Sequence, residues 1–266
     1  MEAMNLRTTV MGILNITPDS FYDGSQDLSV KAIQNKYKNI KDASIIDIGC
    51  ESTRPGSFSI EASEEIRRLG LALPIIRKNK DKIFSIDTSK EDVAKFALEN
   101  GFKIINDITA GRKSKNMLSL AADYNAKIIL MHMLGTPDIM QENPRYTSVI
   151  DELDAFFEER IEKAIKANIK LENIIIDPGI GFGKTISDND LILQNIGQFK
   201  KYNCPILIGV SRKSFLQHME DEAINRLPAT LGVTAIAINN GADIVRVHDV
   251  KQTISMLASV ERIISV

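Results

Sequence analysis

The chain has 266 residues, with 33 basic and 35 acidic side chains and a formal net charge of −2. This balance excludes a broad basic face for nucleic acid, and no apolar run approaches the roughly 18 residues of a membrane span. The N-terminus lacks a signal-peptide pattern, and the two cysteines, Cys50 and Cys204, form no CxxC pair, so we expect a cytoplasmic protein. No linker divides the chain, and we expect one domain over residues 1–266.

Eight short apolar runs, each followed by polar side chains, dominate the pattern. They span residues 10–14, 45–48, 83–86, 104–105, 128–131, 174–176, 206–210 and 244–247. Helical periodicity lies between them, most clearly at about 61–78, 89–101, 147–168 and 251–264. Ser89 with Asp92 resembles a capping signal for the second of these helices. This alternation of strand and helix predicts a parallel sheet.

The number of runs favours a closed (β/α)₈ barrel over a doubly wound open sheet. An open sheet also alternates strand and helix, but its ligand site lies at one switch point. Here polar residues follow all eight runs, and barrels carry their chemistry at the carboxyl ends of the strands. We therefore expect a single-domain α/β TIM barrel with its active site at that end. The longer segments 17–28 and 52–60, which follow the first two runs, are candidate mobile loops.

Three acceptor side chains end the third, fourth and sixth runs: Asp87, Asn106 and Asp177. A buried carboxylate requires donors or a cation, so this trio suits a heterocycle edge rich in N–H groups. The alternative for Asp87 is a helix cap, although Ser89 is better placed for that role. The alternative for Asp177 is a plain turn with Pro178 and Gly179.

Cationic residues follow other strands: Arg54, Lys213, Arg246 and His248. Arg246 and His248 are two positions apart and so share one face of a strand end. Arginine binds oxyanions with its planar fork, and barrels often hold phosphate near their last two strands, so we infer a phosphate-bearing substrate. The alternative is solvated surface charge, which we expect for Arg212.

The glycine-rich segment 178–185 follows the sixth run but matches neither common nucleotide-binding pattern. Pro178 stands where a P-loop needs glycine, and the third glycine comes one residue early for a dinucleotide fingerprint. We infer a loop that lets a flat ligand approach its backbone. His132 lies between two methionines and is interpreted as a core residue, and Cys50 needs only to be small. No metal cage is evident, although Asn15 offers one oxygen to Mg²⁺.

Together these clusters form an ordered set of motifs. They read MGILNITPDSF at 11–21, ESTRPG at 51–56, SIDTSK at 85–90, INDI at 105–108, MHM at 131–133, DPGIGFGK at 177–184, SRK at 211–213 and RVH at 246–248. In this order they closely resemble the dihydropteroate synthase family of folate biosynthesis, essentially from end to end. The resemblance implies a pterin-binding TIM barrel. It implies a transferase that joins 6-hydroxymethyl-7,8-dihydropterin diphosphate to p-aminobenzoate, releases pyrophosphate, uses Mg²⁺, forms a homodimer and is a sulfonamide target.

The resemblance also implies roles for individual residues. Asp87, Asn106, Asp177 and Lys213 would hold the pterin. Asn15, Thr53, Arg54, Arg246 and His248 would hold the diphosphate, with Mg²⁺ at Asn15. Ser211, Phe182 and the segment Arg54-Pro55 would shape the p-aminobenzoate site, while Phe21 and Asp23 would lie on a closing loop. Lys213, Arg246, His248 and Asp87 are the expected catalytic residues.

Two departures from the family pattern stand out. The second loop opens with Gly49-Cys50-Glu51 rather than Gly-Gly-Glu, and Leu134 occupies a position where glutamine is common. Neither removes a charged ligand. A pterin-dependent methyltransferase barrel is the alternative enzyme, but it should lack the Ser-Arg-Lys and Arg-Val-His elements. A catalytically silent pterin-binding paralogue is the alternative from another class, against which Asn15, Arg54 and Lys213 argue.

Overall fold

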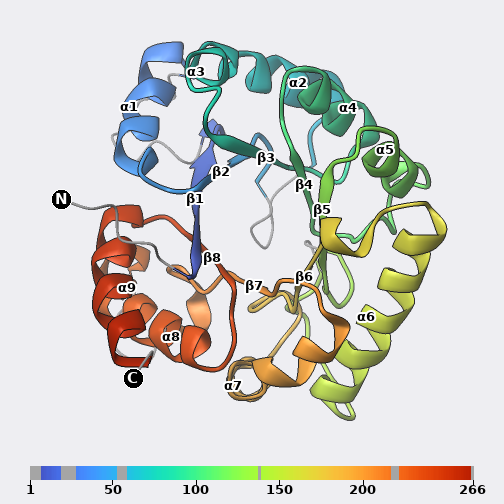
Figure 1. Cartoon of the computed structure of the whole chain (residues 1–266), viewed down its shortest axis with the longest axis vertical. Helices are drawn as coiled ribbons and strands as arrows, with labels where there is room; N and C mark the ends of the chain where they lie inside the picture. Colours follow the sequence, from blue (N-terminus) through green and yellow to red (C-terminus); the bar gives the residue numbers. More distant parts are fainter. Residues whose placement is uncertain (1–6, 19–27, 53–58, 137–138, 217–221, 265–266) are drawn as a thin grey trace.

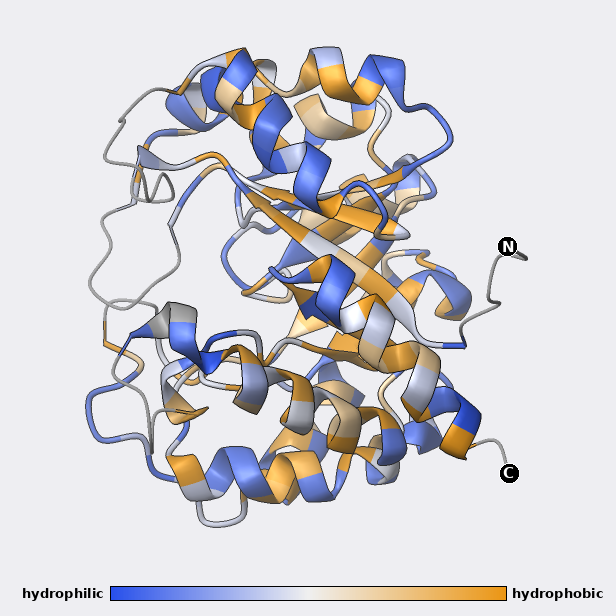
Figure 2. Ribbon diagram, turned by 90° about the vertical axis from the view of Figure 1, so that its left-hand side faces the viewer, coloured by the Kyte–Doolittle hydropathy of each residue, from blue (hydrophilic) through white to orange (hydrophobic). Residues whose placement is uncertain are grey.

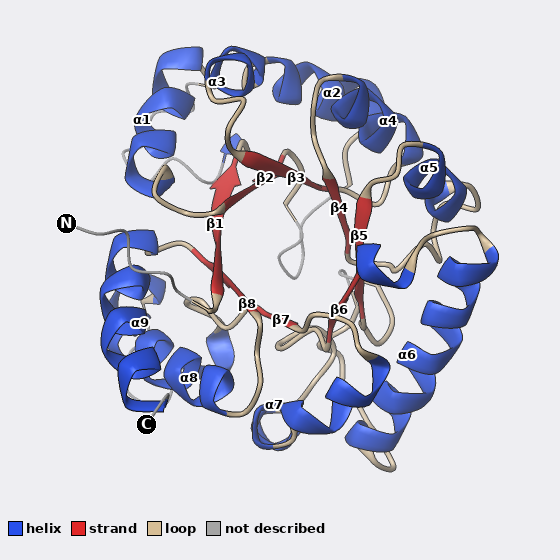
Figure 3. Cartoon of the chain, viewed as in Figure 1, coloured by secondary structure: helices blue, strands red, loops and turns tan. Residues whose placement is uncertain are grey.

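The chain folds into a ring of eight parallel strands surrounded by helices, as seen in the computed structural model (Figures 1 and 3). The structure describes residues 7–18, 28–52, 59–136, 139–216 and 222–264. The strands are β1 Thr9–Asn15, β2 Ile45–Gly49, β3 Ile83–Asp87, β4 Ile104–Asp107, β5 Lys127–Met131, β6 Ile174–Asp177, β7 Leu207–Ile208 and β8 Ile244–Val247. The α-helices are α1 Val30–Ile40, α2 Ala62–Gly70, α3 Leu73–Lys78, α4 Glu91–Glu99, α5 Met117–Asp123, α6 Val149–Lys166, α7 Ile186–Gln194, α8 Leu227–Asn239 and α9 Val250–Ile264.

The predicted barrel is confirmed. The sheet order is β6-β5-β4-β3-β2-β1-β8-β7, with every neighbouring pair parallel. The two end strands meet through a parallel bridge between Ile176 and Ile206, and the Ile176 N–H donates to the Pro205 carbonyl at 3.0 Å. An open doubly wound sheet would leave these edges apart. The carboxyl ends of all eight strands therefore surround one mouth.

Apolar side chains fill the barrel below that mouth. One inward-facing residue from each of seven strands forms a buried layer: Met11, Ile45, Ile104, Ile129, Ile175, Leu207 and Ile244. A second, larger core lies between the outer faces of the strands and the helices, so the ribbon is most hydrophobic near the strands (Figure 2). Because strand side chains alternate, the next inward position along each strand lies nearer the mouth, and there the polar residues begin.

Two helix predictions need correction. The single helix expected over about 61–78 is two helices, α2 and α3, because the chain turns at Leu71 and Ala72 and Pro74 opens the second helix. The helix expected to open at Ser89 begins instead at Glu91, with Lys90 as its N-cap and no side-chain cap. Thr88 accepts the Lys90 N–H at 3.2 Å, which forms a local turn before the helix and does not cap its first turn.

The seventh strand is shorter than the predicted 206–210. The Ile206 N–H donates to the Asp243 carboxylate at 2.7 Å rather than to a neighbouring strand. Beyond Ile208 the chain turns, with the Lys213 N–H donating to the Val210 carbonyl at 3.2 Å. The turn brings Ser211 and Lys213 to the mouth. Among the described helices, none is long and apolar enough to cross a membrane.

Candidate active site

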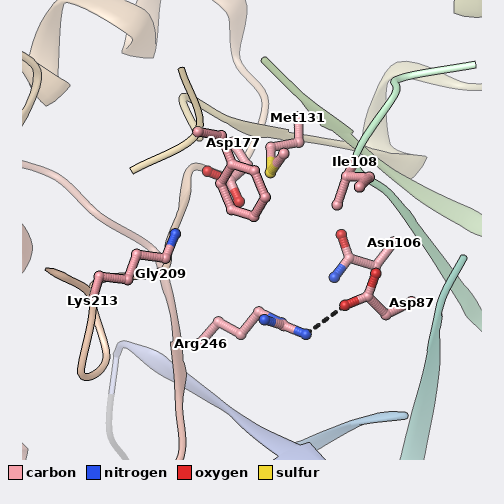
Figure 4. Close-up of a pocket in the computed structure, with 9 residues that line it drawn as sticks. Asp87, Asn106, Ile108, Met131, Asp177, Gly209, Lys213 and Arg246 are labelled. Carbon is pink, nitrogen blue, oxygen red and sulfur yellow. Dashed lines mark hydrogen bonds and ion pairs between the residues drawn. The ribbon is translucent and has the colours of Figure 1, made fainter. Parts of the chain in front are cut away.

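A pocket opens at the carboxyl ends of the strands, and Figure 4 shows the side chains that line it. Its lining residues are Asp87, Asn106, Ile108, Met131, Asp177, Phe182, Gly209, Lys213 and Arg246. Strand register explains the gathering, since Asp87 pairs with Asn106 across β3 and β4, and Met131 pairs with Asp177 across β5 and β6. The three predicted acceptors, Asp87, Asn106 and Asp177, therefore line one pocket.

Arg246 lies at the centre of the charged network. Its Nε donates to Asp47 at 2.7 Å and its Nη2 donates to Asp87 at 2.6 Å, the contact dashed in Figure 4. The Asn106 amide donates to the same Asp47 oxygen at 3.1 Å. The guanidinium is thus fixed before any ligand arrives, and two carboxylates compensate its charge.

Burial governs the protonation of this network. It raises the pKa of Asp87 to about 7, opposed by the charge of Arg246 and reinforced by that of Asp47. Burial also works against the charge of Arg246, but Asp47 and Asp87 outweigh it and raise the pKa of Arg246 above its ordinary value. Arg246 is therefore a permanent cation, and its contact with Asp87 supports the charged form of that carboxylate against burial.

Lys213 and Asp177 form the other side of the pocket. Burial lowers the pKa of Lys213 to about 8, although Asp177 favours its charged form. Burial likewise raises the pKa of Asp177, opposed by Lys213. The Lys213 ammonium donates to the Ile180 carbonyl and lies 4.5 Å from the centroid of the Phe182 ring. A cation, a carboxylate and an aromatic face thus adjoin one another.

The glycine-rich loop that follows β6 packs directly on the end of β5. A side-chain carbon at Gly179 would lie 1.9 Å from the His132 carbonyl oxygen, and one at Gly183 would lie 2.7 Å from that of Leu134. Both glycines have positive φ. The Asp177 carboxylate accepts the Gly179 N–H at 2.7 Å, so Asp177 lines the pocket and also caps its own turn.

Ser211 and His248 meet at the rim. The Ser211 Oγ lies 3.0 Å from His248 Nδ1 and accepts the His248 backbone N–H at 3.2 Å. The strand alternation predicted that Arg246 and His248 share a face. The structure places Arg246 deeper and the exposed His248 at the mouth. The two residues predicted for different substrates, Ser211 and His248, are direct neighbours.

Arg212 is not the solvated surface charge that we expected. Its guanidinium makes a two-point contact with Asp249, at 2.8 Å from Nε and 2.6 Å from Nη2. Its backbone has φ of 58°, its N–H donates to Thr230, and its carbonyl accepts from Arg226. The left-handed backbone at Arg212 therefore directs its side chain to Asp249 and away from the pocket, while Ser211 and Lys213 face the mouth.

Asn15 ends β1 beside Gly49. A side-chain carbon at Gly49 would lie 3.2 Å from the Asn15 amide oxygen. The Asp87 oxygen 3.7 Å from the same position already accepts from Arg246, so Asn15 is the oxygen donor that this position offers to a metal. Hard oxygen donors with few protein ligands fit Mg²⁺, which keeps waters and substrate oxygens. Within the described part of the chain no group of three or more His, Cys, Asp or Glu side chains is placed to hold a metal.

Five predicted site residues, Phe21, Asp23, Thr53, Arg54 and Pro55, lie outside the described residues. Both segments interpreted as mobile loops fall largely there as well. The base of the second segment is described, where Glu51 accepts hydrogen bonds from Ser59 and from the Ile60 N–H at 2.8 and 2.7 Å. One carboxylate therefore joins the residues on either side of positions 53–58.

Two important residues were missed by the sequence analysis: Asp47 and Lys184. Asp47 sits inside an apolar run, and a charged residue there should have signalled a buried partner. Lys184 Nζ lies 3.0 Å from His132 Nδ1, and burial lowers the pKa of His132 to about 2, so this ring is neutral. Cys50 is buried with its pKa raised well above the ordinary value by burial, which agrees with a merely structural position.

Comparison with known proteins is consistent with this geometry. The family described as pterin binding enzyme matches residues 11–248. A dihydropteroate synthase of Escherichia coli K12 is 40% identical over 259 residues, covering 96% of this chain and 92% of that protein. A Yersinia pestis dihydropteroate synthase solved with a sulfonamide drug superimposes with a TM-score of 0.91 at 35% identity, covering 97% of this chain and 94% of that one. A Xanthomonas albilineans dihydropteroate synthase solved with 4-aminobenzoic acid superimposes with a TM-score of 0.91 at 34% identity, covering 98% of this chain and 94% of that one.

Proposed function

The chain belongs to the family of pterin-binding enzymes, and we propose that it is a transferase of folate biosynthesis with dihydropteroate synthase activity. It condenses 6-hydroxymethyl-7,8-dihydropterin diphosphate with p-aminobenzoate to give 7,8-dihydropteroate and pyrophosphate. The observation that carries this proposal is the pocket itself. Asp87, Asn106 and Asp177 present acceptors around a narrow opening whose remaining polar residues are Lys213 and Arg246.

The pterin edge fits the acceptor trio. Its N–H groups would donate to Asp87, Asp177 and the Asn106 amide oxygen, while Lys213 would donate to an acceptor of the ring. The Phe182 ring and the side chains of Ile108 and Met131 line the same pocket and suit the flat faces of the heterocycle. Arg246 holds Asp87 in place through its 2.6 Å contact, so the carboxylate does not need to reorganise when the ligand binds.

The diphosphate would lie at the mouth, between the ends of β1, β2 and β8. Asn15, Thr53, Arg54, Arg246 and His248 are the residues that we assign to it. Asn15 would hold a Mg²⁺ ion together with diphosphate oxygens and water, and a bound Mg²⁺ would neutralise charge on the leaving group. The Ser211 hydroxyl lies 3.0 Å from His248 Nδ1, so it helps to orient the ring toward the anion.

The reaction needs no protein nucleophile. The bond between the pterin methylene carbon and the diphosphate oxygen breaks, and pyrophosphate leaves with the electron pair. The electron-rich dihydropterin ring stabilises the resulting carbocation. The amine nitrogen of p-aminobenzoate then forms the new C–N bond and loses a proton. Preorganised cations around the departing anion, Lys213 and Arg246 among them, contribute on the order of several kcal/mol to such a step.

The p-aminobenzoate ring would lie above the pterin, near Ser211, Phe182 and the segment Arg54-Pro55. Ser211 is positioned by the same turn that places Lys213, whose Nζ lies 4.5 Å from the centroid of the Phe182 ring. The arylamine is therefore expected between the pterin pocket and the rim.

A two-substrate assay tests the function. The purified chain is incubated with the pterin diphosphate and Mg²⁺, with p-aminobenzoate omitted, supplied, or replaced by a sulfonamide. We expect pyrophosphate release that is rapid with p-aminobenzoate, slow without it and lost in EDTA. The sulfonamide arm should give a pterin–sulfonamide adduct by mass spectrometry. Binding of a pterin by calorimetry without any product would instead identify a silent paralogue.

We further propose a cytoplasmic homodimer, an expectation that rests on the resemblance to the family. Sedimentation velocity of the purified chain at several concentrations tests the oligomeric state. A sedimenting species of twice the 29.6 kDa chain mass is the expected result.

A further inference from the structure

The loop between β6 and α7 is held by a buried lysine that the proposed chemistry does not use. Lys184 is 3% exposed. Its ammonium lies 3.0 Å from the Gly179 carbonyl oxygen, 3.1 Å from that of Phe182, 3.4 Å from that of His132, and 3.0 Å from His132 Nδ1. All four acceptors are neutral groups. Two belong to the loop and two belong to the residue that follows β5, so one side chain fastens the loop to the neighbouring strand end.

The loop fastened in this way carries pocket residues. The peptide of Gly179 gives its carbonyl to Lys184 and its N–H to Asp177, at 2.7 Å. The next residue, Ile180, offers its carbonyl to Lys213, and Phe182 places its ring beneath the same ammonium. Lys184 and Asp177 therefore both bind the peptide of Gly179. The backbone of the same loop links Lys184 to Ile180 and Phe182, which contact Lys213.

Other side chains also hold this loop, but they bind different residues of it. Gln141 donates to the Gly181 carbonyl at 2.6 Å, and Tyr146 donates to the Gly183 carbonyl at 2.7 Å. The Gly181 N–H donates to Asn189 at 2.7 Å. These bonds hold the outer half of the loop. Among these contacts, Lys184 is the one that reaches the carbonyl of Gly179, beside Asp177.

We propose that Lys184, with His132 as its partner, is a positioning residue that sets the loop carrying Phe182 and thereby the placement of Asp177 and Lys213 for the pterin. The proposal rests on the pterin-binding function. It also gives His132 a role: the neutral ring offers Nδ1 as the partner of Lys184 at 3.0 Å. The edge-to-face contact with Phe156, whose ring centroid lies 4.8 Å away, keeps the His132 ring in place.

The test compares Lys184→Met, which keeps the chain length but removes the donors, with the matched pair His132→Asn and His132→Leu. Asparagine retains an acceptor close to the position of Nδ1, and leucine does not. Lys166→Met is the control, because it removes a lysine from an exposed ion pair with Glu162 on α6. Calorimetry with 6-hydroxymethylpterin measures binding, and steady-state kinetics give separate KM values for the two substrates.

We expect Lys184→Met and His132→Leu to raise the Kd for 6-hydroxymethylpterin about 10- to 100-fold, and the KM for p-aminobenzoate to rise as well, because the same loop carries Phe182. His132→Asn should restore most of the affinity, which a general packing defect would not allow. Wild-type affinity in Lys184→Met, or equal losses in His132→Asn and His132→Leu, would overturn the positioning role alone. A wild-type chain that does not bind the pterin would instead contradict the proposed function on which this role depends.

Discussion

Arg246 on β8 and Asp47 on β2 form an ion pair of 2.7 Å in the middle of the barrel, although 199 positions separate them in the sequence. Asp47 is fully buried, and one of its oxygens accepts from Arg246 and Asn106. The same guanidinium reaches Asp87 at 2.6 Å. A carboxylate that does not line the pocket thus fixes two residues that do. The orientation of Arg246 is therefore part of the folded barrel and does not wait for substrate.

Asp47→Asn tests this arrangement. The amide keeps the shape but loses a charge, so Arg246 loses a charge-assisted hydrogen bond of about 1.5–3 kcal/mol. We expect turnover to fall about 10- to 100-fold, in line with that loss. Steady-state kinetics measure the effect, with Glu162→Gln as a control in an exposed ion pair with Lys166. Turnover equal to that of the control variant would mean that Asp47 has no influence on the site.

Pterin binding should weaken above the pKa of Lys213, which burial lowers to about 8. The protonated amine is the hydrogen-bond donor, so the Kd for 6-hydroxymethylpterin should rise by up to about tenfold per pH unit above pH 8. Lys213→Arg stays charged in this range, and its affinity should therefore depend less on pH. Calorimetry from pH 7 to 10 measures both slopes. A steeper or unchanged slope in Lys213→Arg would assign the titration to another group.

The stability of the ligand-free chain should respond to Lys213 with the opposite sign. The pKa falls from 10.5 in the unfolded chain to about 8 in the folded one, so between these values the unfolded chain binds more protons. The contribution of Lys213 to the free energy of unfolding therefore increases as pH rises from about 8 to 10.5. Urea unfolding of the wild type and of Lys213→Met checks this. The stability of the wild type relative to Lys213→Met should rise over that window, and a constant difference would contradict the expectation.

The success of the sequence analysis follows from strand periodicity. Asp87, Asn106 and Asp177 each end an apolar run, and parallel strands bring such ends together, so their meeting was predictable. Asp47 was missed because it lies within an apolar run. Isoleucines flank it on both sides, so its inward position is not evident from the pattern. Lys184 was missed because its acceptors are mostly backbone carbonyls, which no side-chain pattern records. The split between α2 and α3 is a local turn that helical spacing alone does not reveal.

Beside the mouth, Lys90 joins Glu51 at 2.7 Å and Glu65 at 2.8 Å. Glu65 is fully buried, so Lys90→Met would leave an uncompensated carboxylate and should destabilise the chain by about 3–5 kcal/mol. The double variant Lys90→Met with Glu65→Leu removes that charge and should recover part of the loss. Urea unfolding provides the values. For comparison, Glu162→Gln removes the exposed partner of Lys166 and should cost at most about 1 kcal/mol. A loss that small in Lys90→Met would show that the ion pairs of Lys90 with Glu51 and Glu65 contribute little to the free energy of unfolding.

Gly179→Ala separates backbone strain from steric contact at the loop. Gly179 and Gly101 both have positive φ, 67° and 98°. A side-chain carbon at Gly179 would lie 1.9 Å from the His132 carbonyl oxygen, whereas one at Gly101 would meet nothing within 4 Å.

Both alanine variants should therefore carry the strain of about 1–3 kcal/mol that a non-glycine residue has in this conformation. Gly179→Ala should cost about 1–3 kcal/mol more, because the loop must move away from β5. Since the Gly179 N–H donates to Asp177 and the loop carries the partners of Lys213, Gly179→Ala should also lose affinity for 6-hydroxymethylpterin, while Gly101→Ala keeps it. Thermal unfolding and calorimetry on both variants decide the matter. Equal affinities would mean that the pocket tolerates displacement of the loop, and the close packing of Gly179 on His132 would then serve stability alone.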